Sequence, residues 1–223
     1  MARKREFDEE QVLEQVMQLF WQKGYEATSM SDLTAATGLQ KPSLYAAYGD
    51  KMSLFEKALR RYNEQHLAKI QQLLDTGKTA KQSFEQVFRY VLQSTIENKN
   101  NDKEKNKNKD NRKILQEAGK DHVDNQSISD YGCYCLNTLV ELAPHHQTFA
   151  VLTREHQMKL GELFTQRLQQ AIQHGEYAAS YNASGHAQIM LVQMIGLTVL
   201  LKANPDPSII QHSAATFLSS LLG

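Results

Sequence analysis

The segment at residues 28–54, TSMSDLTAATGLQKPSLYAAYGDKMSL, constrains the fold more than any other part of this chain. Ser29 and, three residues later, Asp32 form a capping box, which predicts that a short helix begins there. Gly38 follows this helix and has the backbone freedom for a turn into a second short helix. Two short helices joined by such a turn are typical of a helix-turn-helix, which we place at about residues 29–48.

Helical spacing continues on both sides of this segment. Asp8 is a good N-cap and Gly24 a good stop for a first helix. A long fourth helix is predicted from Lys51 to about Leu74. Apolar residues then recur at helical spacing over residues 84–92, 133–142, 149–174, 184–201 and 209–222. No stretch shows the alternation of a β-strand, so the predicted fold class is all-α.

These patterns predict an N-terminal three-helix DNA-binding domain and a C-terminal helical domain. We expect the helix-turn-helix domain at residues 1–50, a connecting helix at 51–75 and the second domain at 76–223. Within it, residues 98–113 read NKNNDKEKNKNKDNRK, with a net positive charge and no apolar side chain. Such a segment buries nothing, so we predict a mobile polar loop there.

The chain has a formal net charge of +0, which at first argues against a nucleic-acid partner. A DNA-binding protein needs a local basic face rather than a basic total. The residues that could supply this face are Arg3, Lys4, Arg5, Lys23, Lys41 and Lys51.

Composition also limits the cellular setting. No run of 18 uncharged apolar residues indicates a membrane span, and the first residues lack the apolar stretch of a signal peptide. Cys133 and Cys135 lie too close in sequence for a comfortable disulfide framework. We therefore expect a cytoplasmic protein with no membrane partner.

A helix that enters the major groove reads base edges with its N-terminal half. On the second helix of the predicted pair, Gln40 can pair with adenine and Lys41 with guanine or a phosphate. Hydroxyl groups suit phosphate oxygens, as do the free N–H groups at the start of the supporting helix. A tyrosine at such a position also fits an ordinary core or surface. The DNA-binding candidates are Thr28, Ser29, Gln40, Lys41, Pro42, Ser43, Tyr45, Tyr48 and Lys51.

Three phrases in residues 5–65 carry a specific resemblance: TSMSDL at 28–33, GLQKPSLY at 38–45 and YGDK at 48–51. They resemble the TetR/AcrR family of transcriptional regulators. The resemblance departs from the family pattern at Ala46 and Ala47, where many members carry His or Tyr. Gln40 replaces a common Ser, so the sequence of the operator cannot be inferred from the operators of relatives.

The resemblance implies a homodimer, usually a repressor, that binds a palindromic operator of double-stranded DNA. It also implies a dimer interface built from the helices at about 184–201 and 206–222, although either could be an ordinary core helix. An unknown small-molecule effector, more apolar than polar, would bind the C-terminal domain and oppose DNA binding. Side chains that could line its pocket, or simply form core, are Phe84, Phe88, Tyr131, Tyr134, Met158, Phe164, Met190 and Met194.

Two other classes of protein are weighed against this one. A metal- or redox-responsive regulator could use thiols and imidazoles from a short stretch, although their spacing matches no strong zinc signature. Both cysteines also fit small buried apolar positions. No phosphate loop, nucleophile elbow or dinucleotide fingerprint indicates an enzyme, so we predict no catalytic residue, cofactor or metal. The metal alternative rests on Cys133, Cys135, His145, His146 and His156.

Overall fold

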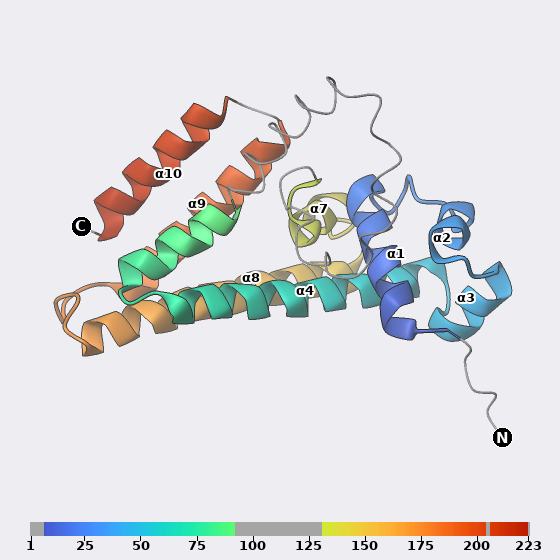
Figure 1. Ribbon diagram of the computed structural model, residues 1–223, viewed down its shortest axis with the longest axis horizontal. Helices are drawn as coiled ribbons and strands as arrows, with labels where there is room; N and C mark the ends of the chain where they lie inside the picture. Colours follow the sequence, from blue (N-terminus) through green and yellow to red (C-terminus); the bar gives the residue numbers. More distant parts are fainter. Residues whose placement is uncertain (1–6, 92–130, 204–205, 223) are drawn as a thin grey trace, which may run out of the picture. The chain divides into compact units, whose positions relative to one another are not determined.

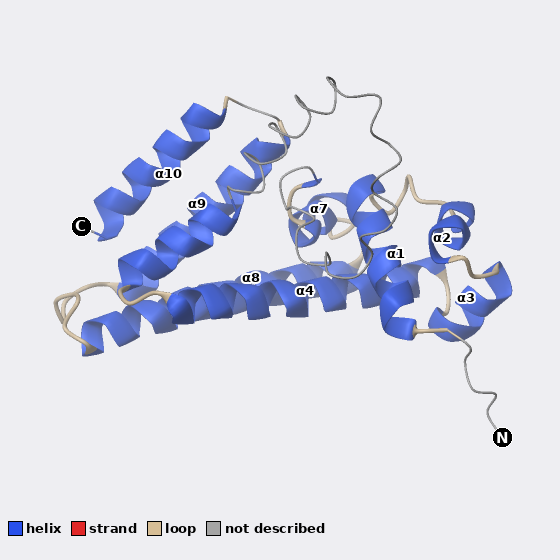
Figure 2. Cartoon of the chain, viewed as in Figure 1, coloured by secondary structure: helices blue, strands red, loops and turns tan. Residues whose placement is uncertain are grey.

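The computed structural model describes residues 7–91, 131–203 and 206–222 (Figure 1). These residues are mostly helical and include no strand, which confirms the all-α prediction (Figure 2). The helices are α1 (Glu9–Lys23), α2 (Met30–Thr37), α3 (Lys41–Tyr48), α4 (Lys51–Thr76), α7 (Tyr134–Glu141), α8 (Gln147–Gln173), α9 (Ala183–Lys202) and α10 (Pro207–Leu222). Residues 80–91, between α4 and α7, are also helical. The predicted polar loop at 98–113 and the bases Arg3, Lys4 and Arg5 lie outside the described residues.

The chain divides into two compact units, each made of two separate stretches of sequence. Unit 1 comprises residues 1–71 and 134–160, and unit 2 comprises residues 72–133 and 161–223. This grouping cuts across the boundaries expected at residues 50 and 75, because α7 and the first part of α8 belong with α1, α2 and α3. The helix-turn-helix therefore shares its core with a segment far away in sequence.

The helix ends in unit 1 follow from local hydrogen bonds. The Asp8 carboxylate accepts from the N–H groups of Glu10 and Gln11 and caps α1. Ser29 and Asp32 form the predicted capping box at the start of α2. Gly38 ends α2 with φ 69°, a left-handed conformation that side chains disfavour. The predicted positions of α2 and α3 are therefore confirmed.

An aromatic cluster centred on Phe55 of α4 forms the core of unit 1. The Phe55 ring lies 4.8 Å from Phe20 of α1, 5.2 Å from Tyr134 of α7 and 5.4 Å from Phe149 of α8, all measured between ring centroids. Each pair meets edge to face, the arrangement that aromatic quadrupoles favour. The cluster ties α1 to α4, α7 and α8.

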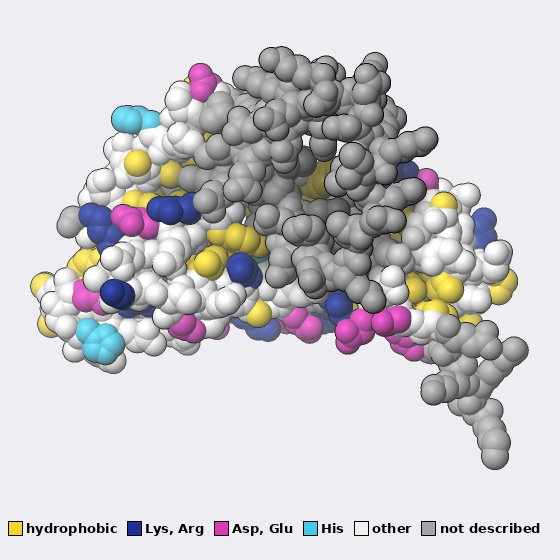
Figure 3. Space-filling model, viewed as in Figure 1, with side chains coloured by type: hydrophobic (Ala, Val, Ile, Leu, Met, Phe, Trp, Pro, Cys, Tyr) yellow, Lys and Arg dark blue, Asp and Glu magenta, His cyan; other side chains and the backbone are white. Residues whose placement is uncertain are grey.

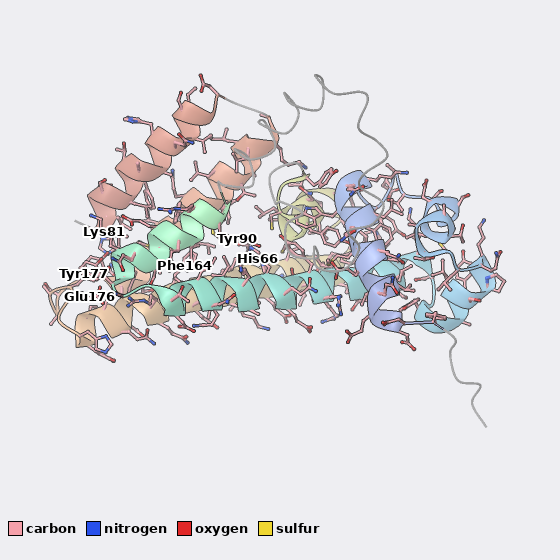
Figure 4. The ribbon with its side chains drawn as sticks, viewed as in Figure 1. His66, Lys81, Tyr90, Phe164, Glu176 and Tyr177 are labelled. Carbon is pink, nitrogen blue, oxygen red and sulfur yellow. The ribbon has the colours of Figure 1, made fainter. Side chains whose placement is uncertain are left out.

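Unit 2 has its own core around the helix at residues 80–91. Phe84 packs edge to face on Phe164 of α8, 5.4 Å away (Figure 4). The buried Arg167 side chain donates from Nε to the Ser83 hydroxyl over 3.0 Å. The Glu176 carboxylate, which lies 3.7 Å from the guanidinium of that arginine, accepts from the Ala80 N–H over 2.6 Å. These bonds fix the helix at 80–91 against the end of α8.

Helix α9 is apolar on more than one face. Its buried residues include Ala187, Met190, Met194 and Leu201, whereas Val192 is 68% exposed. By length and composition alone α9 could cross a membrane, although the sequence predicted no membrane span, and 33% of its 18-residue apolar window is buried. The core helix of a soluble protein passes the same test.

Candidate nucleic-acid interface

The leading surface of α3 is open to solvent. Gln40, Lys41 and Ser43 are exposed, and Tyr45 is 47% exposed. Leu44, on the opposite side of the helix, is 1% exposed and anchors α3 in the core of unit 1. On the face that Figure 3 shows, hydrophobic and basic side chains both appear over the region of α2 and α3, separated by other atoms. A short anchored helix with one exposed polar edge can enter a DNA groove.

Two of the expected DNA contacts are interior residues instead. Tyr48 is 5% exposed, and its hydroxyl donates to the Glu9 carbonyl over 3.1 Å. Thr28 is fully buried, and its hydroxyl donates to the Gly24 carbonyl over 2.6 Å. Tyr48 therefore holds α3 to α1, and Thr28 closes the turn before α2. Helical spacing did not reveal that these side chains point inward.

At the start of α2, hydrogen-bonding groups of the backbone and side chains already bond one another. The Asp32 carboxylate accepts from the N–H and hydroxyl of Ser29 over 2.8 and 2.7 Å, and from the Lys23 ammonium over 2.9 Å. The bond from Lys23, and to a smaller extent the bonds from Ser29, hold the pKa of Asp32 well below its usual range. Lys23, expected as part of the basic face, is therefore paired with an acid.

Lys51 begins α4 and is half-buried. Its ammonium lies 4.1 Å from the centroid of the Tyr25 ring, a cation–π contact. The preceding Asp50 accepts from the Ser53 N–H over 2.7 Å, and this backbone bond lowers the pKa of Asp50. The contact with Tyr25 neutralises no charge.

Glu141, the last residue of α7, was not expected to touch the helix-turn-helix. Its carboxylate accepts from the N–H groups of Tyr25 and Glu26, over 3.1 and 2.9 Å, in the turn between α1 and α2. A Cβ atom at Gly24 would lie 3.0 Å from one carboxylate oxygen. The residues that meet here are more than a hundred positions apart, so no local pattern predicts the contact.

The residues expected to line an effector pocket fall in both units. Tyr134 is buried in unit 1, whereas Phe84, Phe88, Phe164, Met190 and Met194 are buried in unit 2, where Tyr131 is half-buried. Met158 is 59% exposed, which corrects its expected place among the lining residues. It lies on the side of α8 opposite the row formed by Leu152, His156 and Leu160.

A buried histidine pair lies inside unit 1. His66 of α4, which Figure 4 labels, and His156 of α8 are 7% and 2% exposed, and His66 Nδ1 lies 3.2 Å from His156 Nε2. Burial lowers the pKa of His66 to about 4 and, with the nearby His66 and Lys159, that of His156 to about 3. His66 was overlooked, although its spacing after Leu59 and Tyr62 puts it on the inward face of α4.

The metal alternative is not supported by the geometry. Within the described part of the chain, which includes all five candidate ligands, no three His, Cys, Asp or Glu side chains come together as a metal site would require. Cys133 and Cys135 are both buried. Small buried apolar roles account for both cysteines.

Comparisons with known proteins cover both parts of the chain. A family model described as bacterial regulatory proteins, tetR family, matches residues 12–58. A second, described as the tetracyclin repressor-like C-terminal domain, matches residues 114–217. The uncharacterized HTH-type transcriptional regulator YezE of Bacillus subtilis (strain 168) is 26% identical over 222 residues, which cover 99% of this chain and 100% of YezE.

Other relatives match in one region or in fold alone. The HTH-type transcriptional repressor ComR of Escherichia coli (strain K12) is 47% identical over 68 residues, which are 30% of this chain and 32% of ComR. The regulator CifR, solved with a 26-base-pair operator, superposes with a TM-score of 0.74 at 24% identity, over 98% of this chain and 99% of that one. A regulator from Cytophaga hutchinsonii gives 0.72 at 20% identity, over 98% and 96%. Since the two family models together span the helix-turn-helix and most of the second half of the sequence, this chain belongs to the TetR family of DNA-binding transcriptional regulators.

Proposed function

We propose that the protein is a cytoplasmic, ligand-responsive repressor that binds a palindromic DNA operator as a homodimer. The observation that carries this proposal is the exposed leading surface of α3, on which Gln40, Lys41, Ser43 and Tyr45 stand clear of the core. Two regional relatives, ComR and BdcR of Escherichia coli (strain K12), are named as repressors. Both match about a third of their own length, so repression enters here as part of the proposal.

Within this proposal each exposed residue of α3 has a distinct task. Gln40 reads a base edge, because its amide can donate and accept at adenine. Lys41 contacts guanine or a phosphate, and the hydroxyls of Ser43 and Tyr45 bind phosphate oxygens. Pro42 fixes the first turn of α3, while Ser29 and Lys51 flank the phosphate backbone. Thr28 and Tyr48 contribute by packing.

Homodimerisation is proposed through α9 and α10. The exposed apolar residues of α9 include Ile189, Val192, Val199 and Leu200, and their spacing gives a second apolar stripe beside the buried one. A Cβ atom at Gly196 would meet nothing within 4 Å, so another helix can approach closely there. Such a stripe is typical of a protein interface. Two α3 helices in a dimer would then read half-sites about 34 Å apart.

The first experiment is selection of bound duplexes from a random pool at near-physiological salt, followed by sequencing. We expect a palindrome with half-sites about one helical turn apart. Lys41→Ala should weaken operator binding and, if the contact is to phosphate, reduce the salt slope by about one. Lys78→Ala, which removes an exposed lysine of unit 2, is the matched control. A pool with no enriched sequence, or equal losses for both variants, would contradict the proposal.

A further inference from the structure

Four buried side-chain atoms of unit 1 have no hydrogen-bond partner among the described residues. They are Asn63 Oδ1 on α4, the Tyr134 hydroxyl on α7, and His156 Nδ1 and Gln157 Oε1 on α8. Buried polar atoms in folded proteins are almost always bonded, because leaving one unpaired is costly. Four such atoms in one unit, contributed by three helices, leave hydrogen-bonding capacity that a bound molecule could use.

Ring contacts join two of these groups, Tyr134 and His156, through Tyr62 and His66. The Tyr134 ring lies 5.5 Å from Tyr62, Tyr62 stacks on His66 at 5.6 Å, and His66 lies 5.1 Å from His156. Asn63 precedes His66 by three residues, so both lie on one face of α4. Asn63, Tyr134 and His156 are 9%, 1% and 2% exposed. We call Asn63, His66, Tyr134 and His156 the polar cluster.

The histidine pair makes the cluster adaptable. One ring donates to the other across the 3.2 Å between His66 Nδ1 and His156 Nε2. When His66 carries the shared proton, the other nitrogen of His156, Nδ1, is a donor. When His156 carries it, that nitrogen is an acceptor. Tyr134 can also do both, while the Asn63 oxygen only accepts. The cluster can therefore bond a group that donates and accepts at once.

The surroundings favour an uncharged partner for this cluster. The cluster itself contains no Lys, Arg, Asp or Glu, the Lys159 side chain is exposed, and the Glu141 carboxylate bonds two backbone N–H groups. A buried ion would have no counter-charge, which is unfavourable. We propose that Asn63, Tyr134 and His156 form the recognition site for a small neutral molecule with a hydroxyl or amide group. This inference rests on the proposed function, in which that molecule is the effector.

Helix α7 connects this site to the helix-turn-helix. Tyr134 is the first residue of α7 and belongs to the polar cluster, whereas Glu141 is the last and bonds the turn that precedes α2. Eight helical residues span only about 12 Å, too short to bend easily. A ligand that draws the Tyr134 hydroxyl therefore shifts the carboxylate that holds the α1–α2 turn. Glu141 is a positioning residue in this scheme.

The test uses three probes of similar size on the full-length protein: phenol, toluene and benzoate. Trp21, the only tryptophan of the chain, lies 5.1 Å from Tyr62 and reports on the cluster by fluorescence. We expect a saturable change with phenol, accompanied by shifts of the His66 and His156 ring nitrogens in NMR spectra. Toluene lacks the hydroxyl and benzoate adds a charge, so both should bind at least about tenfold more weakly. Equal responses to phenol and toluene, or none to phenol, overturn the assignment.

The variant Tyr134→Phe distinguishes two explanations of the unpartnered atoms: a site for a ligand, or a cluster that buried water already satisfies. If the hydroxyl is unpaired in the free protein, this variant keeps or raises the thermal midpoint and loses phenol binding about tenfold. A lower midpoint, or phenol binding like that of the unmodified chain, overturns the proposal, because the hydroxyl would then already be bonded. Leu136→Met, a nearby buried change on α7, is the packing control.

Operator binding is measured in parallel, so that failure of the site and failure of the proposed function can be told apart. If the operator binds but phenol does not, only the site assignment fails. If phenol binds but no operator is found, only the repressor proposal fails. Glu141→Gln should keep phenol binding and lose the effect of phenol on operator affinity, whereas Glu155→Gln, an exposed change on α8, should keep both. An undiminished effect in Glu141→Gln overturns the role of α7.

Discussion

At the scale of single residues, unit 1 depends on a few side chains that complete backbone hydrogen bonds. Ser29 accepts from the Asp32 N–H over 3.1 Å, and Asp32 returns a bond to the Ser29 N–H. Such reciprocal bonds are local in sequence. For this reason the start of α2 could be predicted from four consecutive residues.

Ser29→Ala should destabilise the protein by about 1 kcal/mol, because α2 loses the hydroxyl that caps its first turn. The free energy of unfolding in urea measures this cost. Ser31→Ala, two residues further on and equally exposed, makes no cap and should change stability little. Similar losses for both substitutions would show that the capping box contributes nothing.

Acid should destabilise the folded protein through the histidine pair. Burial holds the pKa of His66 at about 4 and that of His156 at about 3, against an ordinary 6.5. Between pH 6.5 and 4 the unfolded chain binds protons that the folded chain excludes, so the free energy of unfolding falls as pH falls. This contribution is fully present above pH 6.5 and is lost towards lower pH.

The check is a series of urea midpoints across that pH range. The double variant His66→Gln, His156→Gln should show a flatter dependence than the unmodified chain. His174→Gln, at an exposed histidine of unit 2, should leave the slope unchanged. Equal slopes in all three proteins would mean that the pair is protonated without penalty.

At the scale of elements, the turn between α1 and α2 brings two distant helices together. Gly24 has φ 81° and ψ 173°, a region open essentially to glycine alone. Its missing side chain also makes room for the Glu141 carboxylate. Gly38, by contrast, has a positive φ but nothing within 4 Å of an added Cβ atom. A substitution at Gly38 therefore measures the cost of backbone strain alone, whereas one at Gly24 measures strain together with crowding.

Gly38→Ala should cost about 1 kcal/mol, from strain alone. Gly24→Ala should cost about 2–4 kcal/mol, because it also displaces a carboxylate that makes two charge-assisted bonds. In a Glu141→Ala background the cost of Gly24→Ala should fall by about 0.5 kcal/mol or more, as a double-mutant cycle in urea would measure. Strict additivity would rule out the crowding.

The helices themselves were predictable from sequence, whereas the contacts of Glu141 and His66 were not. Caps, glycine turns and apolar spacing act within a few residues, so the bounds of α1, α2 and α3 follow from the chain. Spacing alone also placed Met158 in the interior, because an apolar residue within a helical pattern does not by itself show which side of α8 faces the core. The partners of a side chain depend on the packing of remote helices.

At the scale of the whole molecule, the second apolar stripe on α9 is the surface that the proposed dimer would cover. The exposed Val192 stands near its middle. Val192→Glu should shift the mass measured by analytical ultracentrifugation from dimer to monomer, because an unpaired charge would be buried. Operator affinity should fall with it. Val140→Glu, at another exposed valine, is the control, and a dimeric Val192→Glu would refute this interface.

Because residues 1–71 and 134–160 form one unit, the part of this regulator that could be transplanted is not its N-terminal third alone. A chimera that joined residues 1–71 to the second half of another regulator would leave the N–H groups of Tyr25 and Glu26 without their acceptor. The exchange would succeed only if the new half supplied a carboxylate at the position of Glu141. Recombination between related genes meets the same condition, so the turn at residues 24–26 and Glu141 should be inherited together.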